Sequence, residues 1–215
     1  MNYYWISTNN DKVSTVAYAP KGTPVSHYLI EEMRNRDDVP FSLELRDVFV
    51  TSKLIVGEVS DVFYDYQPNS LAWPVMSEKM KSIIASHLTG SEYIEWKSIT
   101  INGKDISQKY YIPMFTRKLD ILNVSESVYV PVSGIVLKPC FDKEKIKNLS
   151  VIHSPNRFWQ ITTQIYVNEE IKRDLIDSGI EELCFALNSD SPGDFWPVRS
   201  GVRCGICLYR YIFRR

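Results

Sequence analysis

The sequence predicts an α+β fold, in which mostly antiparallel strands carry a few packed amphipathic helices. Short runs of aromatic and β-branched residues recur between turn-forming clusters, a pattern typical of strands. Two stretches, one after Ser77 and one after Asn168, instead space their apolar residues three and four apart, as on one face of a helix. With 44% hydrophobic residues and only 9 Gly and 11 Pro among 215, the chain has the composition of a folded protein with a sizeable core.

Residues 1–70 are interpreted as a β-rich N-terminal segment. Two strand-forming runs, 3–7 and 13–18, flank a polar cluster, so we expect an opening β-hairpin. Pro20 and Pro24 then interrupt the strand pattern. The further elements expected here are a short helix that carries Val25, Leu29 and Met33 on one face, and strands within 41–55 and 61–67.

Residues 71–198 are expected to form the α+β core. Its clearest element is a helix capped by Ser77, with Glu78 in the first turn and an apolar stripe that ends near Gly90. The turn-forming pair Asn102-Gly103 then joins two strand patterns into a hairpin. We expect that hairpin from 93–101 and 110–115, strands at 128–132, 135–137, 151–152 and 158–161, and a short helix at 143–149.

The pattern around Ser77 returns around Asn168. Ser77 matches Asn168 and Lys81 matches Lys172, at a constant offset of 91 residues. Each expected helix is followed by a glycine and then by a strand that begins with an acidic residue. Two interpretations stay open: either the chain contains two copies of one helix–strand unit, or any capped amphipathic helix before a strand looks like this.

The segments 1–70, 71–198 and 199–215 are expected to fold together, because the chain length suits one compact domain or two small lobes. Charge is balanced, with 25 Lys and Arg against 26 Asp and Glu, so no overall field attracts nucleic acid or a membrane surface. The opening residues lack the pattern of a secretory signal, and no apolar run approaches the ~20 residues that cross a bilayer. We therefore expect a cytoplasmic protein without membrane association.

Cysteine and histidine form no recognisable metal or catalytic pattern. The four cysteines are too few for a disulfide scaffold and are interpreted as thiols of a reducing compartment. Cys204 and Cys207 make a single Cys-x-x-Cys pair, which we interpret as two thiols on a terminal strand rather than a zinc or redox site. His27, His87 and His153 are isolated, and the nucleophile-elbow, phosphate-loop and dinucleotide patterns are missing. We expect no catalytic residue, no metal and no cofactor.

Residues 199–215 carry five arginines and no acidic residue, interleaved with aromatic side chains. Such a segment suits a charged edge strand, a cationic face for a protein partner, or contacts with nucleic acid, in that order of preference. Aromatic and arginine side chains often anchor protein interfaces, and Trp196 lies in an expected loop just before this segment. The candidate partner-binding residues are Trp196, Arg199, Arg203, Tyr209, Arg210 and Tyr211.

A series of short patterns between residues 75 and 185 resembles a known family. In order they are VMSEKMKSII, EYIEW, YYIPM and KLD, followed by FWQI, IYVNEEIK and GIEELCF. This order resembles a bacterial family, formerly of unknown function, that is classed among the immunity proteins of polymorphic toxin systems. The resemblance covers about half of the chain. It implies a protein that binds and neutralises a cognate toxin without catalysis, and it offers no catalytic residue to transfer.

Three functions therefore remain in view. The leading one is an immunity-type protein that acts by stoichiometric binding to a toxin through shape and charge complementarity. The alternative is a small-molecule-binding domain or an enzyme with a site built from loops, and the third is nucleic-acid binding through the arginine-rich C-terminus. A pocket that holds titratable groups with shifted pKa values favours the second function, whereas a broad exposed apolar surface favours the first.

Overall fold

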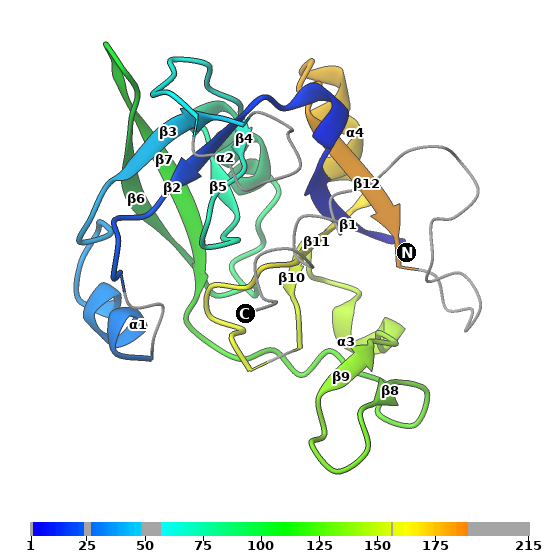
Figure 1. The fold of residues 1–215 in the computed structure, drawn as a ribbon. Coiled ribbons are helices and arrows are strands. Elements are labelled where there is room, and N and C mark those ends of the chain that lie inside the picture. The colour runs from blue at the N-terminus through cyan, green and yellow to red at the C-terminus, as the bar shows by residue number, and fades with distance from the viewer. Residues whose placement is uncertain (1, 24–26, 49–56, 156, 189–215) are drawn as a thin grey trace.

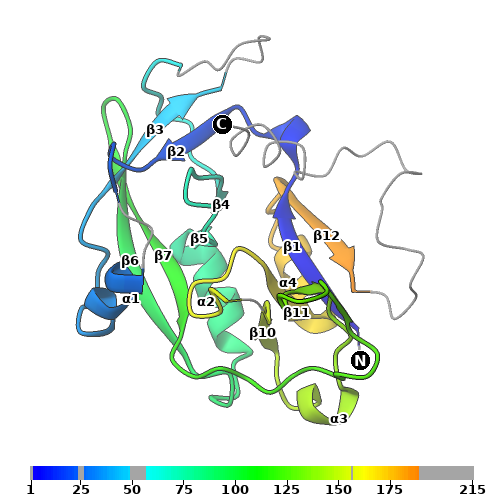
Figure 2. The same cartoon turned by 60° about the horizontal axis from the view of Figure 1, so that its bottom comes forward.

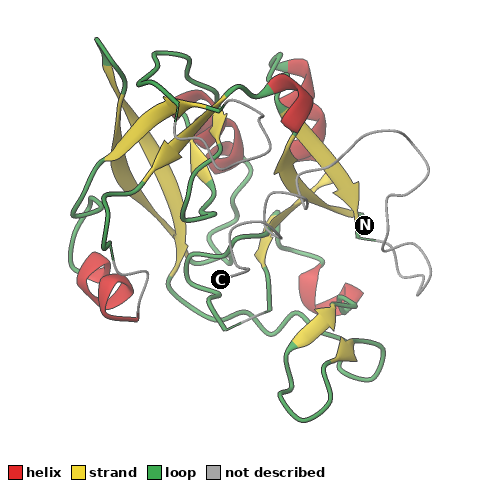
Figure 3. Cartoon of the chain, in the orientation of Figure 1, coloured by secondary structure: helices red, strands yellow, loops and turns green. Residues whose placement is uncertain are grey.

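The computed structural model describes residues 2–23, 27–48, 57–155 and 157–188, and within them the fold is α+β, as predicted (Figures 1 and 3). One sheet has the order β2-β3-β6-β7-β5-β4 and another the order β10-β11-β1-β12. All pairings in them are antiparallel except that of β3 with β6. The strands of the first sheet are β2 (Thr15–Tyr18), β3 (Leu43–Asp47), β6 (Ile94–Asn102), β7 (Ser107–Phe115), β5 (Val75–Met76) and β4 (Tyr66–Gln67). Those of the second are β10 (Val151–His153), β11 (Ile165–Asn168), β1 (Tyr3–Thr8) and β12 (Leu183–Leu187).

The remaining described elements are four helices, a 3-10 turn and a separate two-stranded ribbon. The helices are α1 (His27–Arg34), α2 (Glu78–Ser86), α3 (Lys143–Ile146) and α4 (Glu169–Asp177); the 3-10 turn is η1 (Asn10–Lys12); the ribbon is β8 (Val128–Tyr129) with β9 (Val136–Lys138). The ribbon lies apart from the two larger sheets in Figure 1, whereas α3 packs on the second sheet, where its Ile146 shares a buried cluster with Tyr3 and Tyr166.

Both long helices begin where the sequence predicts. The Ser77 hydroxyl accepts a hydrogen bond from the amide of Met80 at 3.2 Å, and the Asn168 carboxamide accepts one from the amide of Ile171 at 3.0 Å. These caps satisfy amides that a helix leaves without an internal partner. The two helices contact each other where the sheets approach (Figure 2). Their apolar faces share one core with both sheets, formed by Ile6, Met76, Met80, Ile84, Phe115, Val167, Ile171 and Leu175.

The predicted opening hairpin is wrong. β1 lies between β11 and β12, whereas β2 pairs with β3 in the other sheet. The intervening η1 turn, capped by the Asn9 carboxamide, carries the chain from one sheet to the other. Period-two patterning identifies a strand but not the strand with which it pairs, because pairing depends on distant residues.

Other strand predictions need shorter bounds. The expected strand within 61–67 is reduced to β4, and that within 41–55 to β3, with 49–56 outside the described residues. The expected strand at 158–161 is a turn region instead, where the carbonyl of Gln160 accepts a hydrogen bond from the amide of Phe115 at 2.8 Å. The hairpin predicted around Asn102-Gly103 is confirmed as β6 and β7. The predicted helix is confirmed as α1, with Leu29 and Met33 buried, whereas Val25 lies outside the described residues.

The two sheets contain the same unit twice. The order β4-β5-β7-β6 matches β10-β11-β1-β12, and the helices α2 and α4 follow β5 and β11. The register matches too, because Met76 lies opposite Tyr111 in one unit and Val167 lies opposite Tyr4 in the other. The second unit takes its fourth strand, β1, from the N-terminal end of the chain (Figure 1). The two similar helix–strand units that the sequence allows are therefore present. They differ in strand order along the chain, because β7 follows the rest of its unit whereas its equivalent, β1, precedes the rest of its own.

Two buried carboxylates join these units. Glu92, which follows α2, accepts a hydrogen bond from the amide of Ser150, just before β10, at 2.7 Å. Glu182, which follows α4, accepts one from the amide of Tyr66 in β4 at 2.8 Å. Glu92 is fully buried and Glu182 nearly so. Each unit thus anchors the first strand of the other through a charge-assisted hydrogen bond.

Candidate protein-binding surface

Exposed apolar side chains gather on one segment, residues 122–141, which we call the arm. Among the described residues, eleven large hydrophobic side chains are exposed, and five of them lie here. No residue from 128 to 138 is buried. The five exposed arm residues are Val124, Val128, Val132, Ile135 and Leu137.

The arm is an ordered ribbon. β8 and β9 pair antiparallel with an irregularity between Val128 and Tyr129. Beyond the strands, the amide of Val130 donates to the carbonyl of Ile135 at 2.8 Å, which closes the tip. The ten residues 128–137 contain no charged side chain, in a chain of which 24% is charged. A long stretch that is both uncharged and exposed is unusual for a protein surface and typical of an interaction site.

The base of the arm is fixed to the core. Leu122 and Phe141 form a β-bridge, and the ring of Phe141 meets that of Tyr166 edge to face at 5.0 Å between centroids. The buried Ser127 hydroxyl accepts a hydrogen bond from the amide of Cys140 at 3.0 Å and contacts the carbonyl of Asn123 at 2.8 Å. The apolar tip is therefore held out by a rigid support rather than lying on the body of the protein.

The tip contains strained backbone. Val132 has φ of 73°, in the left-handed region that β-branched residues rarely occupy, and its side chain is fully exposed. No packing compensates for this conformation locally, because the side chain contacts little of the described protein. Backbone strain of this kind concentrates at functional sites.

The described residues also line a shallow polar pocket of about 510 Å³, away from the arm. Two of its charged groups pair with each other: the Arg36 guanidinium donates to both carboxylate oxygens of Asp38, at 3.0 and 3.4 Å, and this hydrogen bonding lowers the pKa of Asp38. Such an ion pair on the rim is not a poised acid or base. The other lining residues are Val39, Pro40, Phe41, Ser42, Ser98, Ile99, Thr100 and Lys109. The described part of the chain contains no cluster of three or more potential metal ligands.

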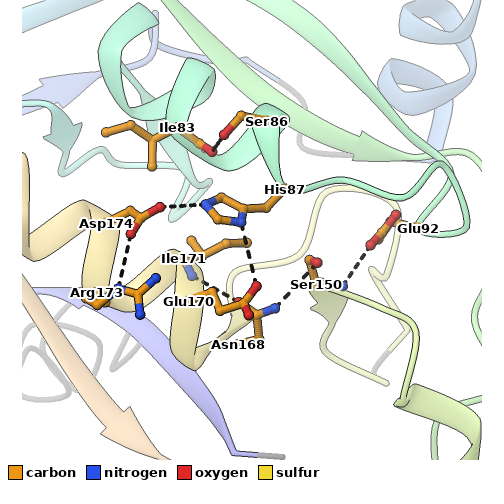
Figure 4. Close-up of polar contacts among 10 residues, drawn as sticks. All are labelled: Ile83, Ser86, His87, Glu92, Ser150, Asn168, Glu170, Ile171, Arg173 and Asp174. Carbon is orange, nitrogen blue, oxygen red and sulfur yellow. Dashed lines mark hydrogen bonds and ion pairs between the residues drawn. The ribbon is translucent and has the colours of Figure 1, made fainter.

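His87 has a structural environment at the junction of α2 and α4. Its Nε2 lies 2.8 Å from a carboxylate oxygen of Asp174, and its Nδ1 lies 4.0 Å from Glu170, both on α4 (Figure 4). Hydrogen bonding to His87 lowers the pKa of Asp174. The sequence places His87 at the end of a helix, and the structure adds the partner helix that it contacts.

His153 is part of the core. Its Nε2 accepts a hydrogen bond from the amide of Leu119 at 2.9 Å, so its Nδ1 is the protonated nitrogen and donates to the carbonyl of Ser154 at 2.8 Å. Burial lowers the pKa of His153 to about 4, which keeps the ring neutral near pH 7. The ring lies against Phe115 and Trp159, at 5.0 and 5.7 Å between ring centroids.

The partner-binding residues expected from the sequence all lie outside the described residues. These are Trp196, Arg199, Arg203, Tyr209, Arg210 and Tyr211, together with the pair Cys204 and Cys207. Sequence reasoning missed the arm, because it assigned 128–132 and 135–137 to strands without asking what covers them. The available signal was the uncharged stretch from 128 to 137.

Comparison with known proteins adds no assignment. No family model matches the chain, and no curated protein matches it either. None of the helices that the structure describes has the length and apolar character of a membrane span.

Proposed function

We propose that the protein is an immunity-type protein, which binds and neutralises a cognate bacterial toxin by stoichiometric, non-catalytic contact. The arm carries this proposal. Residues 128–137 present apolar side chains to solvent on a support that is anchored in the core, as an interface element would. The resemblance of the sequence to immunity proteins supports the same function.

The two other functions have weaker support. A small-molecule site or enzyme would use the pocket beside Arg36, but that pocket is open and its one carboxylate, Asp38, is paired with Arg36. Nucleic-acid binding would depend on the arginine-rich residues 199–215 alone, because the overall charge of the chain is −1 and does not attract phosphates. Neither has an observation comparable to the arm.

The test is capture of the tagged protein's partner, followed by a toxicity assay with matched variants. Ile135 in the arm and Ile176 on α4 are equally exposed, at 56% and 52%, so Ile135→Asn and Ile176→Asn remove similar apolar surface. The captured protein is expected to be toxic when expressed alone and harmless with the wild type or Ile176→Asn. Ile135→Asn is expected to lose protection while retaining its circular dichroism spectrum and melting temperature.

Two outcomes contradict immunity function, and a third contradicts the role of the arm in it. In the first outcome, the captured protein is harmless when expressed alone. In the second, the purified protein retains a bound metabolite or nucleic acid and no protein partner. In the third, Ile135→Asn and Ile176→Asn protect equally, because the toxin binds a surface other than the arm. The first two exclude immunity function, and the third excludes the arm as the contact surface.

A further inference from the structure

The chemistry of the arm restricts the kind of partner surface that it fits. We infer that the arm inserts into an uncharged, apolar groove of the partner, and not into a cationic cleft of the type that binds nucleic acid. This inference rests on the proposed function and specifies the partner surface at the same site.

Absence of charge is the first step of the argument. Within the arm, residues 128–137 contain no Asp, Glu, Lys, Arg or His, and the charged residues Glu126 and Lys138 flank this stretch on its two sides. A charged partner group that is buried against this surface loses its hydration without gaining an opposite charge, which is costly. A cationic cleft instead selects an acidic inhibitor. The complementary surface is therefore apolar.

The two-stranded form of the arm is the second step. Val128 and Leu137 are exposed on the paired strands, and Val132 and Ile135 are exposed at the tip. Seven of the eleven residues from 128 to 138 are exposed and the other four are part-buried, so much of the ribbon is open to a partner. A groove with two walls would bury this surface better than a flat patch. Its walls must also offer hydrogen-bonding groups to the outward-facing backbone of both strands.

Stiffness is the third step. The bridge between Leu122 and Phe141 and the Ser127 hydrogen bonds hold the base of the arm before any partner binds. A preordered ribbon loses less conformational entropy on binding than a loop that must fold, so an apolar contact of modest size suffices. The strained residue Val132 lies at the end that would enter the groove first.

The experiment measures the affinity of the captured toxin for the wild type while NaCl is raised from about 0.05 M to about 0.5 M. An apolar contact predicts that Kd changes by less than about threefold, whereas a cationic cleft predicts a much steeper dependence. Ile135→Asp and Ile135→Lys are expected to weaken binding alike, by at least about tenfold. Ile176→Asp and Ile176→Lys, at the matched exposed position, are expected to leave Kd unchanged.

Opposite effects of Asp and Lys at position 135, or a steep salt dependence, would overturn the inference while leaving immunity function intact. Failure to find a toxic partner would overturn the proposed function instead. A measurement without a toxin separates the two: on a phenyl column, Ile135→Asn is expected to shorten retention clearly more than Ile176→Asn. Equal retention of the two variants, or a wild type that dimerises through the arm in light scattering, contradicts an arm open to a partner's groove.

Discussion

Two equivalent groups of side chains appear on the two units. The ammonium group of Lys81 lies 3.9 Å from the ring centroid of Tyr111, and that of Lys172 lies 3.7 Å from the ring centroid of Tyr4. Each lysine also pairs with a glutamate three residues earlier in its helix, at 3.1 and 3.2 Å. Hydrogen bonding to these tyrosines is the main cause of the lowered pKa of each glutamate. The same chemistry at the same offset supports the equivalence of the units at the level of individual atoms.

This equivalence predicts matched stability effects. Lys81→Met and Lys172→Met keep the length and apolar stem of the side chain but remove the charge over the ring. Each is expected to lower the free energy of unfolding by about 0.5–1 kcal/mol, and by similar amounts. Urea unfolding of the two variants checks this. A large effect in one unit and none in the other would contradict the equivalence.

His153 makes stability depend on pH. Its pKa is about 4 in the folded protein and near 6.5 in the unfolded chain. Between these values the unfolded chain binds a proton that the folded protein does not, so stability falls as the pH drops through this window, by up to about 3 kcal/mol. Urea unfolding at neutral pH and near the lower pKa measures the loss. His153→Gln is expected to reduce it; a variant with the full pH dependence of the wild type would show that other groups are responsible.

At the scale of elements, the sequence predicts best what depends on neighbouring residues. Ser77 and Asn168 cap helices whose apolar stripes lie within a few turns, and both helices appear where expected. The pairing of β1 depends on residues more than 150 positions away, such as Val167 opposite Tyr4, and the predicted hairpin is therefore wrong. The arm was recognised as strands but not as a surface, because an uncharged apolar stretch such as 128–137 is also typical of a buried strand.

The left-handed residue of the arm gives a prediction at this scale. Val132→Gly relieves strain at φ of 73° and removes a side chain that packs on nothing described. It is expected to raise stability by up to about 1 kcal/mol, while weakening partner binding through the loss of apolar surface. Val124→Gly is the control, because this exposed valine is not among the residues with positive φ. Glycine at this position relieves no strain and makes the unfolded chain more flexible, so this substitution is expected to lower the stability of the protein. Thermal melting and partner affinity of both variants are the measurements.

For the whole molecule, the shared core and the crossed carboxylates predict that the two units unfold together. Glu92→Ala leaves the buried amide of Ser150 without its acceptor, and Glu182→Ala does the same to the amide of Tyr66. Each is expected to cost about 1–3 kcal/mol. Far-ultraviolet circular dichroism and tryptophan fluorescence should report one coincident transition in the wild type and in both variants. Two separate transitions would mean that the units are independent domains.

The position of β1 also has a consequence for synthesis of the chain. This strand is made before its partners β11 and β12, which lie within residues 165–187. At about 5–20 residues per second, the ribosome needs roughly ten to forty seconds to supply them. During that interval an aromatic segment with Tyr3, Tyr4 and Trp5 has no native strand beside it, so the nascent chain is exposed to misassembly until its last unit emerges.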